Sequence, residues 1–161
     1  MIWFLAYVAT IFGANWSIET YGFVSVGFGL TAPAGVYFAG AAFTFRDLIH
    51  RSIGKWWSLV AVGVGAGLSA FVSTDFAIAS GVAFGLSEFA DFLIYTPLWK
   101  KRWPLAVAAS NAVGLVVDSA LFLWLAFGSL DFIEGQIIGK LWVTVAAVAI
   151  LWGVRRARPR P

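Results

Sequence analysis

The chain has 161 residues, of which 61% are hydrophobic and 12% are charged, and its net charge is +3. Soluble domains carry about 25% charged residues, so this composition leaves too little polar surface for a water-soluble core of this size. The absence of cysteine and the single histidine, His50, exclude a disulfide framework and a cysteine or histidine metal site. We therefore expect one membrane domain over residues 1–161, without a metal or another cofactor.

Charged residues divide the chain into six apolar segments, at residues 1–18, 20–45, 56–74, 76–95, 104–127 and 132–154. About 20 residues of helix cross the hydrocarbon of a bilayer. Backbone groups in lipid must bond within their own segment, so helices are expected. The pattern predicts an all-α integral membrane protein, a compact bundle of six transmembrane helices. Since its start is not basic, we expect the first helix to be retained rather than removed as a signal peptide.

The basic residues predict the orientation of this bundle. Ten of the eleven lysines and arginines follow the second, fourth and sixth segments, whereas the other three connections carry only acids. The positive-inside rule then places both termini in the cytoplasm. The basic tail "RRARPRP" is interpreted as a topology signal, not as a nucleic-acid contact.

Glycines and a proline predict how the helices pack. Gly63 with Gly67, and Gly135 with Gly139, are spaced by four residues, which favours close helix contacts. A phosphate-binding glycine loop would need a strand before it and a helix after it, so this alternative is rejected. Pro33 predicts a kink in the second helix. A discontinuous helix that lines a substrate cavity remains the functional alternative to tight packing.

The apolar segments contain three acids, Glu88, Asp91 and Asp118, and one base, Lys140. Counted at about 1.5 Å of rise per residue, Asp118 and Lys140 lie at one depth and could form an ion pair. A second layer nearer the cytoplasm would hold Glu88, Asp91 and Asn111, with Arg46, Asp47 and Arg51 below it. With one base for three acids, at least one carboxylate must be protonated, hydrated or awaiting a ligand. The alternative to a binding role is that these acids and Lys140 form ion pairs that only hold the helices together. Arg46, Asp47 and Arg51 would then be ordinary loop charges.

Catalysis is not expected from these residues. His50 stands alone, without a serine, histidine and aspartate set or a metal motif. A polar cavity inside a helical bundle favours a small molecule in transit, so the protein is not expected to be an enzyme.

The segments "GANW", "RDLIHRSIG", "SEFADF" and "SNAVGLVVDSALFLW" follow one another in an order that resembles the queuosine-precursor transporter family, also known as the VUT family. Lys140 matches the lysine of the family's last helix, but Ile150 stands where members often carry a proline. The resemblance assigns substrate binding to Asn15, Glu88, Asp91, Asn111, Asp118 and Lys140. It assigns gating or coupling to Arg46, Asp47 and Arg51. It implies uptake of a 7-deazaguanine, preQ0 or preQ1, by a multi-pass protein of the cell (inner) membrane.

The chemistry of these residues is compatible with such a substrate. A guanine-like edge carries two parallel donors, N1–H and an exocyclic amine, and a carboxylate such as Glu88 or Asp91 would accept both. Asn111 would bond the O6 carbonyl or ring N–H groups. Aromatic residues such as Phe84 or Tyr95 would stack on the heterocycle.

Three other functions remain open at this point. The best alternative is the substrate-binding S-component of an energy-coupling-factor vitamin importer, which would need a partner ATPase. An ion channel would conduct ions instead of showing saturable uptake. An intramembrane enzyme is disfavoured by the missing catalytic set. The expected partners are a nucleobase-like small molecule and the lipid bilayer, without nucleic acid, and a homo-oligomer is compatible with the sequence.

Overall fold

The computed structural model describes residues 1–98 and 103–157. Within these ranges it does not describe the side chains at positions 47, 50, 51, 55, 58, 91, 92, 95, 96, 103–108, 110, 148 and 151–157. The described part folds into six helices, α1 (Ile2–Tyr21), α2 (Val36–Ile53), α3 (Lys55–Ser69), α4 (Thr74–Leu98), α5 (Trp103–Phe127) and α6 (Ile133–Ala157). Two strands, β1 (Phe23–Gly27) and β2 (Leu30–Pro33), separate α1 from α2.

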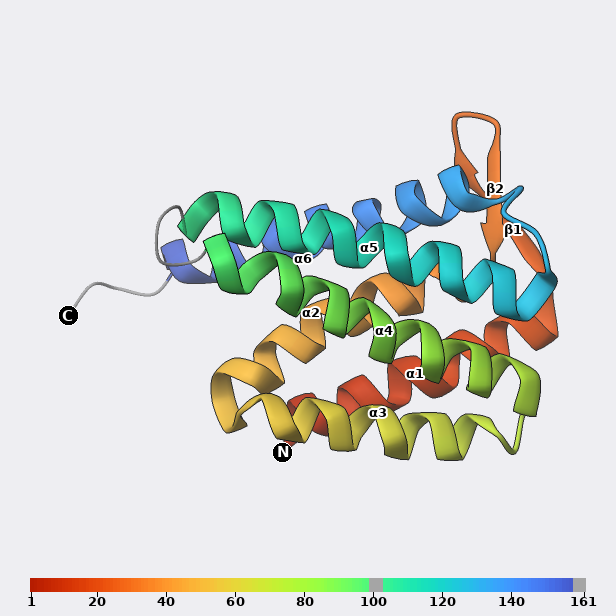
Figure 1. Cartoon of the computed structure of the whole chain (residues 1–161), viewed down its shortest axis with the longest axis horizontal. Coiled ribbons are helices and arrows are strands. Elements are labelled where there is room, and N and C mark those ends of the chain that lie inside the picture. The colour runs from red at the N-terminus through yellow and green to blue at the C-terminus, as the bar shows by residue number, and fades with distance from the viewer. Residues whose placement is uncertain (99–102, 158–161) are drawn as a thin grey trace.

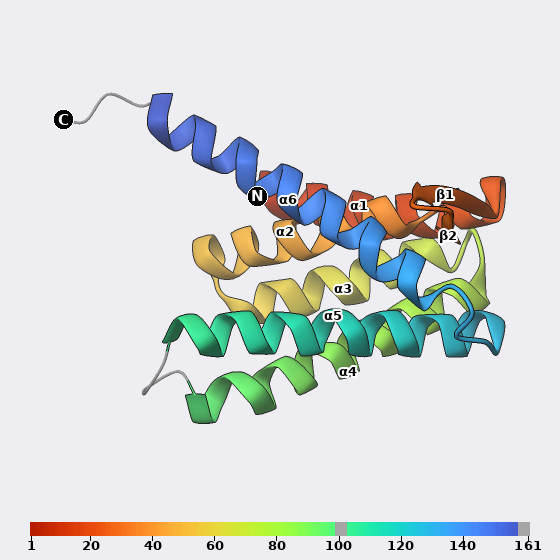
Figure 2. The ribbon, with the colours of Figure 1, turned by 90° about the horizontal axis from the view of Figure 1, so that it is seen from above.

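The helices form one elongated bundle (Figure 1). α4 packs along α5, α1 packs against α2 and α3, and α2 packs against α6. Figure 2 shows α4 and α5 on one side of the bundle, with α1, α2 and α6 on the other. The start of α1 and the end of α6 lie toward the same end as the α2–α3 junction, while the hairpin lies at the opposite end (Figure 1).

The structure confirms the predicted bundle of six helices. Within the described ranges, none of the helices has both the length and the apolar character needed to traverse a bilayer.

The second apolar segment, residues 20–45, is not one helix, so the prediction of a single helix for this segment is wrong. β1 and β2 pair antiparallel, from Phe23 opposite Pro33 to Gly27 opposite Leu30. The turn between them has positive φ at Gly27, Phe28 and Gly29, of 95°, 55° and 74°. Glycine adopts this conformation at little cost, which allows the tight reversal. Pro33 therefore ends a strand before α2 begins and does not kink a helix.

The hairpin is held against α6 by close backbone contact. A Cβ atom at Gly135 would collide with the carbonyl oxygen of Thr31. One at Gly139 would lie 2.6 Å from Cγ2 of Val36, too close for any real side chain. The Trp142 indole also donates a hydrogen bond to the carbonyl oxygen of Val26, at 3.1 Å. Close packing at the Gly135–Gly139 spacing is therefore confirmed, although the partners are the hairpin and the start of α2.

The other glycine pair does not pack in this way. A Cβ atom at Gly63 or Gly67 would meet no described atom within 4 Å. Gly65, on another face of α3, is the close contact, because its Cβ would lie 2.7 Å from Cδ1 of Ile11 on α1. The prediction for Gly63 and Gly67 is wrong because spacing alone does not specify which face of a helix meets its neighbour.

Three apolar clusters form the core of the described part, and the smallest, Val26, Ala32 and Val36, lies at the hairpin. The other two border the cavity. One contains the buried residues Tyr7, Val8, Ala42, Ile49, Ala61 and Phe84. The other, nearer the hairpin, contains Ile18, Ala79, Ala83, Phe122 and Leu123. The cavity described below is lined by members of both clusters, so polar groups interrupt the core between them.

Candidate functional site

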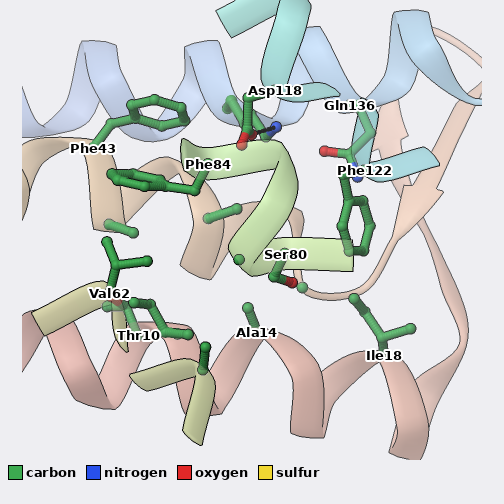
Figure 3. Close-up of a pocket in the computed structure, with 17 residues that line it drawn as sticks. Thr10, Ala14, Ile18, Phe43, Val62, Ser80, Phe84, Asp118, Phe122 and Gln136 are labelled. Atoms are coloured by element: carbon green, nitrogen blue, oxygen red, sulfur yellow. Dashed lines mark hydrogen bonds and ion pairs between the residues drawn. The ribbon is translucent and has the colours of Figure 1, made fainter. Parts of the chain in front are cut away.

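A cavity of about 70 Å³ lies inside the bundle, and all six helices contribute to its wall. Its polar lining residues are Thr10, Ser80, Asp118, Gln136 and Lys140. Three aromatic rings, those of Phe43, Phe84 and Phe122, also line it (Figure 3). Most of the remaining wall is aliphatic or glycine. An apolar cavity with a few convergent polar groups is the usual form of a small-molecule site.

A buried ion pair joins α5 to α6 at the cavity wall. The ammonium nitrogen of Lys140 donates to Oδ2 of Asp118 at 2.6 Å and to Oγ of Ser119 at 2.9 Å. Lys140 is 1% exposed and Asp118 is 8% exposed. A buried charge is tolerated when it is paired and hydrogen-bonded. The pairing that their common depth indicated is present, whereas their role in substrate binding stays a prediction.

Glycine in α2 allows α6 to bring Lys140 inside the bundle. A Cβ atom at Gly40 would lie 3.2 Å from the Cα of Lys140 and 2.9 Å from the Cβ of Val143. This separation is too small for a larger residue at position 40. The glycine at position 40 therefore allows the close approach of α2 and α6 at Lys140.

Phe43 connects this ion pair to a second one. The Lys140 ammonium lies 5.9 Å from the centroid of the Phe43 ring, and the Arg46 guanidinium lies 5.4 Å from it. Both distances are within the range of cation–π attraction. The Phe43 and Phe84 rings have centroids 6.2 Å apart. These two rings line the cavity on the side of Arg46 and Glu88.

The second ion pair joins Arg46 on α2 to Glu88 on α4. The sequence placed Arg46 outside the second helix, below the layer of acids. In the structure α2 continues to Ile53, so Arg46 lies within a helix and is 9% exposed. Glu88 therefore has a cationic partner, and counting bases within the apolar segments underestimated the available positive charge. The proposed substrate contact of Glu88 stays a prediction, and Glu88 does not line the cavity.

Asn15 lies behind the cavity wall. Its side chain is fully buried, and its Oδ1 accepts a hydrogen bond of 2.9 Å from Oγ of Ser80 on α4. Its Nδ2 has no hydrogen-bond partner among the described residues. Ser80 lines the cavity and Asn15 does not, so Asn15 orients a residue of the wall.

The expected lower layer is only partly within the described structure. Asn111 is exposed on α5 and does not line the cavity, although it is seven residues from Asp118. The side chains of Asp47, Arg51 and Asp91 lie outside the described residues. Glu88 with Arg46 is the part of this layer that can be placed.

Sequence reasoning missed Gln136 and Ser119. Gln136 precedes Lys140 by four residues, so both side chains lie on one face of α6. Ser119 follows Asp118 directly and accepts from Lys140. The helical spacing from Lys140 was the signal that could have identified Gln136. Among the side chains that the structure describes, no group of three histidine, cysteine, aspartate or glutamate residues could hold a metal ion.

The described helices thus enclose an ion pair and an amide in a largely apolar cavity. Residues 71–155, more than half of the chain, match the family model described as "Putative vitamin uptake transporter". The chain belongs to this family of transporters, and family membership implies a membrane location. The matched part covers Glu88, Asp118 and Lys140. No curated protein and no solved structure matches the chain.

Proposed function

We propose that this transporter takes up a 7-deazaguanine, such as preQ0 or preQ1, and holds it in the cavity between the helices. The observation that carries the proposal is the convergence of Asp118, Lys140 and Gln136 in one cavity that also has aromatic walls. A flat heterocycle with several hydrogen-bonding groups matches this combination of surfaces.

Asp118 supplies the acceptor for the donors of the base. Its Oδ2 is engaged by Lys140, and the carboxylate has a second oxygen with which to accept. Hydrogen bonds to a charged carboxylate are the stronger kind, so an exocyclic amine is well matched to Asp118. PreQ1 also carries an ammonium group, which would interact favourably with a carboxylate. PreQ0 lacks this group.

Aromatic rings supply the contacts to the faces of the base. Phe43, Phe84 and Phe122 line the cavity from α2, α4 and α5. Stacked or edge-to-face contacts contribute about 0.5–1.5 kcal/mol beyond the burial of area. A planar aromatic ligand therefore gains more binding free energy from these rings than a flexible ligand of the same polarity.

We further propose that the protein is a multi-pass protein of the cell (inner) membrane with both termini in the cytoplasm. The concentration of lysine and arginine in alternate connections supports this orientation. The ion pair of Arg46 and Glu88, with Asp47 and Arg51, would then lie between the cavity and the cytoplasm and act in gating or coupling.

The test uses the purified full-length protein. A thermal-shift screen with 7-deazaguanines, purines and vitamins should show stabilisation by the deazaguanines, because a ligand of the native state raises the apparent stability. Proteoliposomes should then show saturable uptake without another protein. Uptake only with an added energy-coupling ATPase would support an S-component instead, and ionic conductance would support a channel. Stabilisation by a vitamin alone would contradict the proposed substrate.

A further inference from the structure

We infer that Gln136 recognises the lactam edge of the ligand, where a ring N–H lies beside a ring carbonyl. The inference rests on the proposed function and assigns a residue that determines its specificity. Gln136 is 2% exposed, and it lines the cavity from the second turn of α6. Its Oε1 has no hydrogen-bond partner among the described residues.

An unpaired buried amide is costly in the empty protein. Burying such a group without a hydrogen bond opposes folding, and buried polar groups in proteins are usually paired. An apolar side chain of similar size would avoid this cost. A partner that arrives with the ligand accounts for a polar side chain at this position.

The side-chain amide of glutamine carries an acceptor next to a donor. A lactam edge carries the complementary pair in the same geometry. The ring N–H would donate to Oε1 of Gln136, and Nε2 of Gln136 would donate to the ring carbonyl. In a guanine-type base these two groups are N1–H and O6.

The position of Asp118 fits the third group on the same edge. In Figure 3 the amide oxygen of Gln136 lies on the side of Asp118, and the amide nitrogen is directed toward Phe122. Along a guanine-type edge the groups follow in the order O6, N1–H, 2-amine, so a base that pairs O6 with Nε2 and N1–H with Oε1 carries its 2-amine on the Oε1 side of Gln136. A base bonded to Gln136 would direct its 2-amine toward Asp118. An adenine-type base has no amine at that place and would leave Asp118 without this donor.

Backbone contacts of α6 fix the position from which the Gln136 side chain extends into the cavity. The Gln136 N–H donates to the carbonyl oxygen of Phe132 at 2.9 Å, so the residue lies within a formed turn. Neighbouring Gly135 lies against the Thr31 carbonyl of the hairpin, which leaves no room for α6 to rotate by a residue. The amide is therefore aimed by the contact between α6 and the hairpin.

The test measures binding of two ligands to the purified full-length protein by calorimetry. The ligands are 7-deazaguanine and 2-amino-7-deazapurine, which keeps the 2-amine but lacks N1–H and O6. The variants are Gln136→Met, with Gln136→Leu as a second apolar substitution, and Thr144→Val as the control. Thr144 is an exposed polar residue of the same helix that bonds the Lys140 carbonyl and lies outside the cavity.

We expect the native protein and Thr144→Val to bind 7-deazaguanine about 10- to 100-fold more tightly than the analogue. Gln136→Met should bind both ligands with similar affinity, and without ligand it should unfold at the same or a higher temperature than the native protein. If both apolar variants keep the native ratio of affinities for the two ligands, the inference is overturned and the proposed function stands. If the native protein binds neither compound, the proposed function fails and the inference fails with it.

Discussion

Lys140 on α6 and Asp118 on α5 form a 2.6 Å ion pair at the wall of the cavity, and the lysine is almost completely buried. Ser119 supplies a second acceptor to the same ammonium group. Such a pair adds little net stability to the fold. Removing one partner is nevertheless destabilising, because it leaves the other charge buried without a counter-ion. The pair links the two helices from which Asp118 and Gln136 reach the cavity.

Removal of one member of this pair should therefore be destabilising. We expect Lys140→Ala to lower the free energy of unfolding by about 3–5 kcal/mol, since Asp118 loses its cation in a buried site. The double variant Asp118→Ala/Lys140→Ala should recover much of this loss. Thermal unfolding in detergent, followed by tryptophan fluorescence, measures both effects.

Transport by the double variant separates a structural from a binding role of the pair. We expect a folded double variant that no longer takes up the substrate, because Asp118 is the proposed acceptor for the exocyclic amine. Normal saturable uptake by a folded double variant would remove both residues from the binding site and leave them as a link between helices.

The contact between α6 and α2 provides a test of the packing. Gly139→Ala places a methyl group 2.6 Å from Cγ2 of Val36, and such overpacking costs about 1–3 kcal/mol. Gly63→Ala is the matched control, because its methyl group would meet no described atom within 4 Å. Alanine favours a helix over glycine by about 1 kcal/mol, so the control should be neutral or more stable. Equal melting temperatures for the two variants would contradict the close contact at Gly139.

The features that the sequence predicted are those that depend on local periodicity and depth. Six helices follow from six apolar segments, and the Asp118–Lys140 pair follows from helical rise. The hairpin was missed because "FVSVGFGLTAP" is as apolar as a helix, and composition does not report the backbone conformation at Gly27 and Gly29. The partner of Glu88 was missed because it depends on where α2 ends. The spacing from Lys140 could have placed Gln136 on the same face of the last helix, but that its amide lines a cavity depends on how the helices pack.

The pair of Arg46 and Glu88 allows binding to be separated from gating. Glu88→Gln keeps the size of the side chain and removes the charge that holds Arg46. If the pair acts as a gate, uptake into proteoliposomes should fall several-fold while the affinity for the ligand in detergent stays within about twofold, because Glu88 does not line the cavity. Arg46→Lys, which retains a positive charge, serves as the control and should impair uptake less.

A different outcome would restore the direct role that the sequence predicted for Glu88. If Glu88→Gln weakens binding by about tenfold or more, the carboxylate contacts the substrate and the pair opens to receive it. If neither binding nor uptake changes, Glu88 has no role in transport.

The orientation of the bundle can be tested directly, because the native chain contains no cysteine. Ser129 lies in the connection between α5 and α6, which contains Asp131 and no base, and Ser52 is exposed near the basic end of α2. We expect a membrane-impermeant thiol reagent to label Ser129→Cys on intact spheroplasts and to label Ser52→Cys only after the membrane is opened. The physical reason is that basic connections are retained in the cytoplasm, whereas connections without bases are exported. Labelling of Ser52→Cys on intact spheroplasts, with Ser129→Cys protected, would reverse the orientation and place the Arg46–Glu88 pair on the outer side of the cavity.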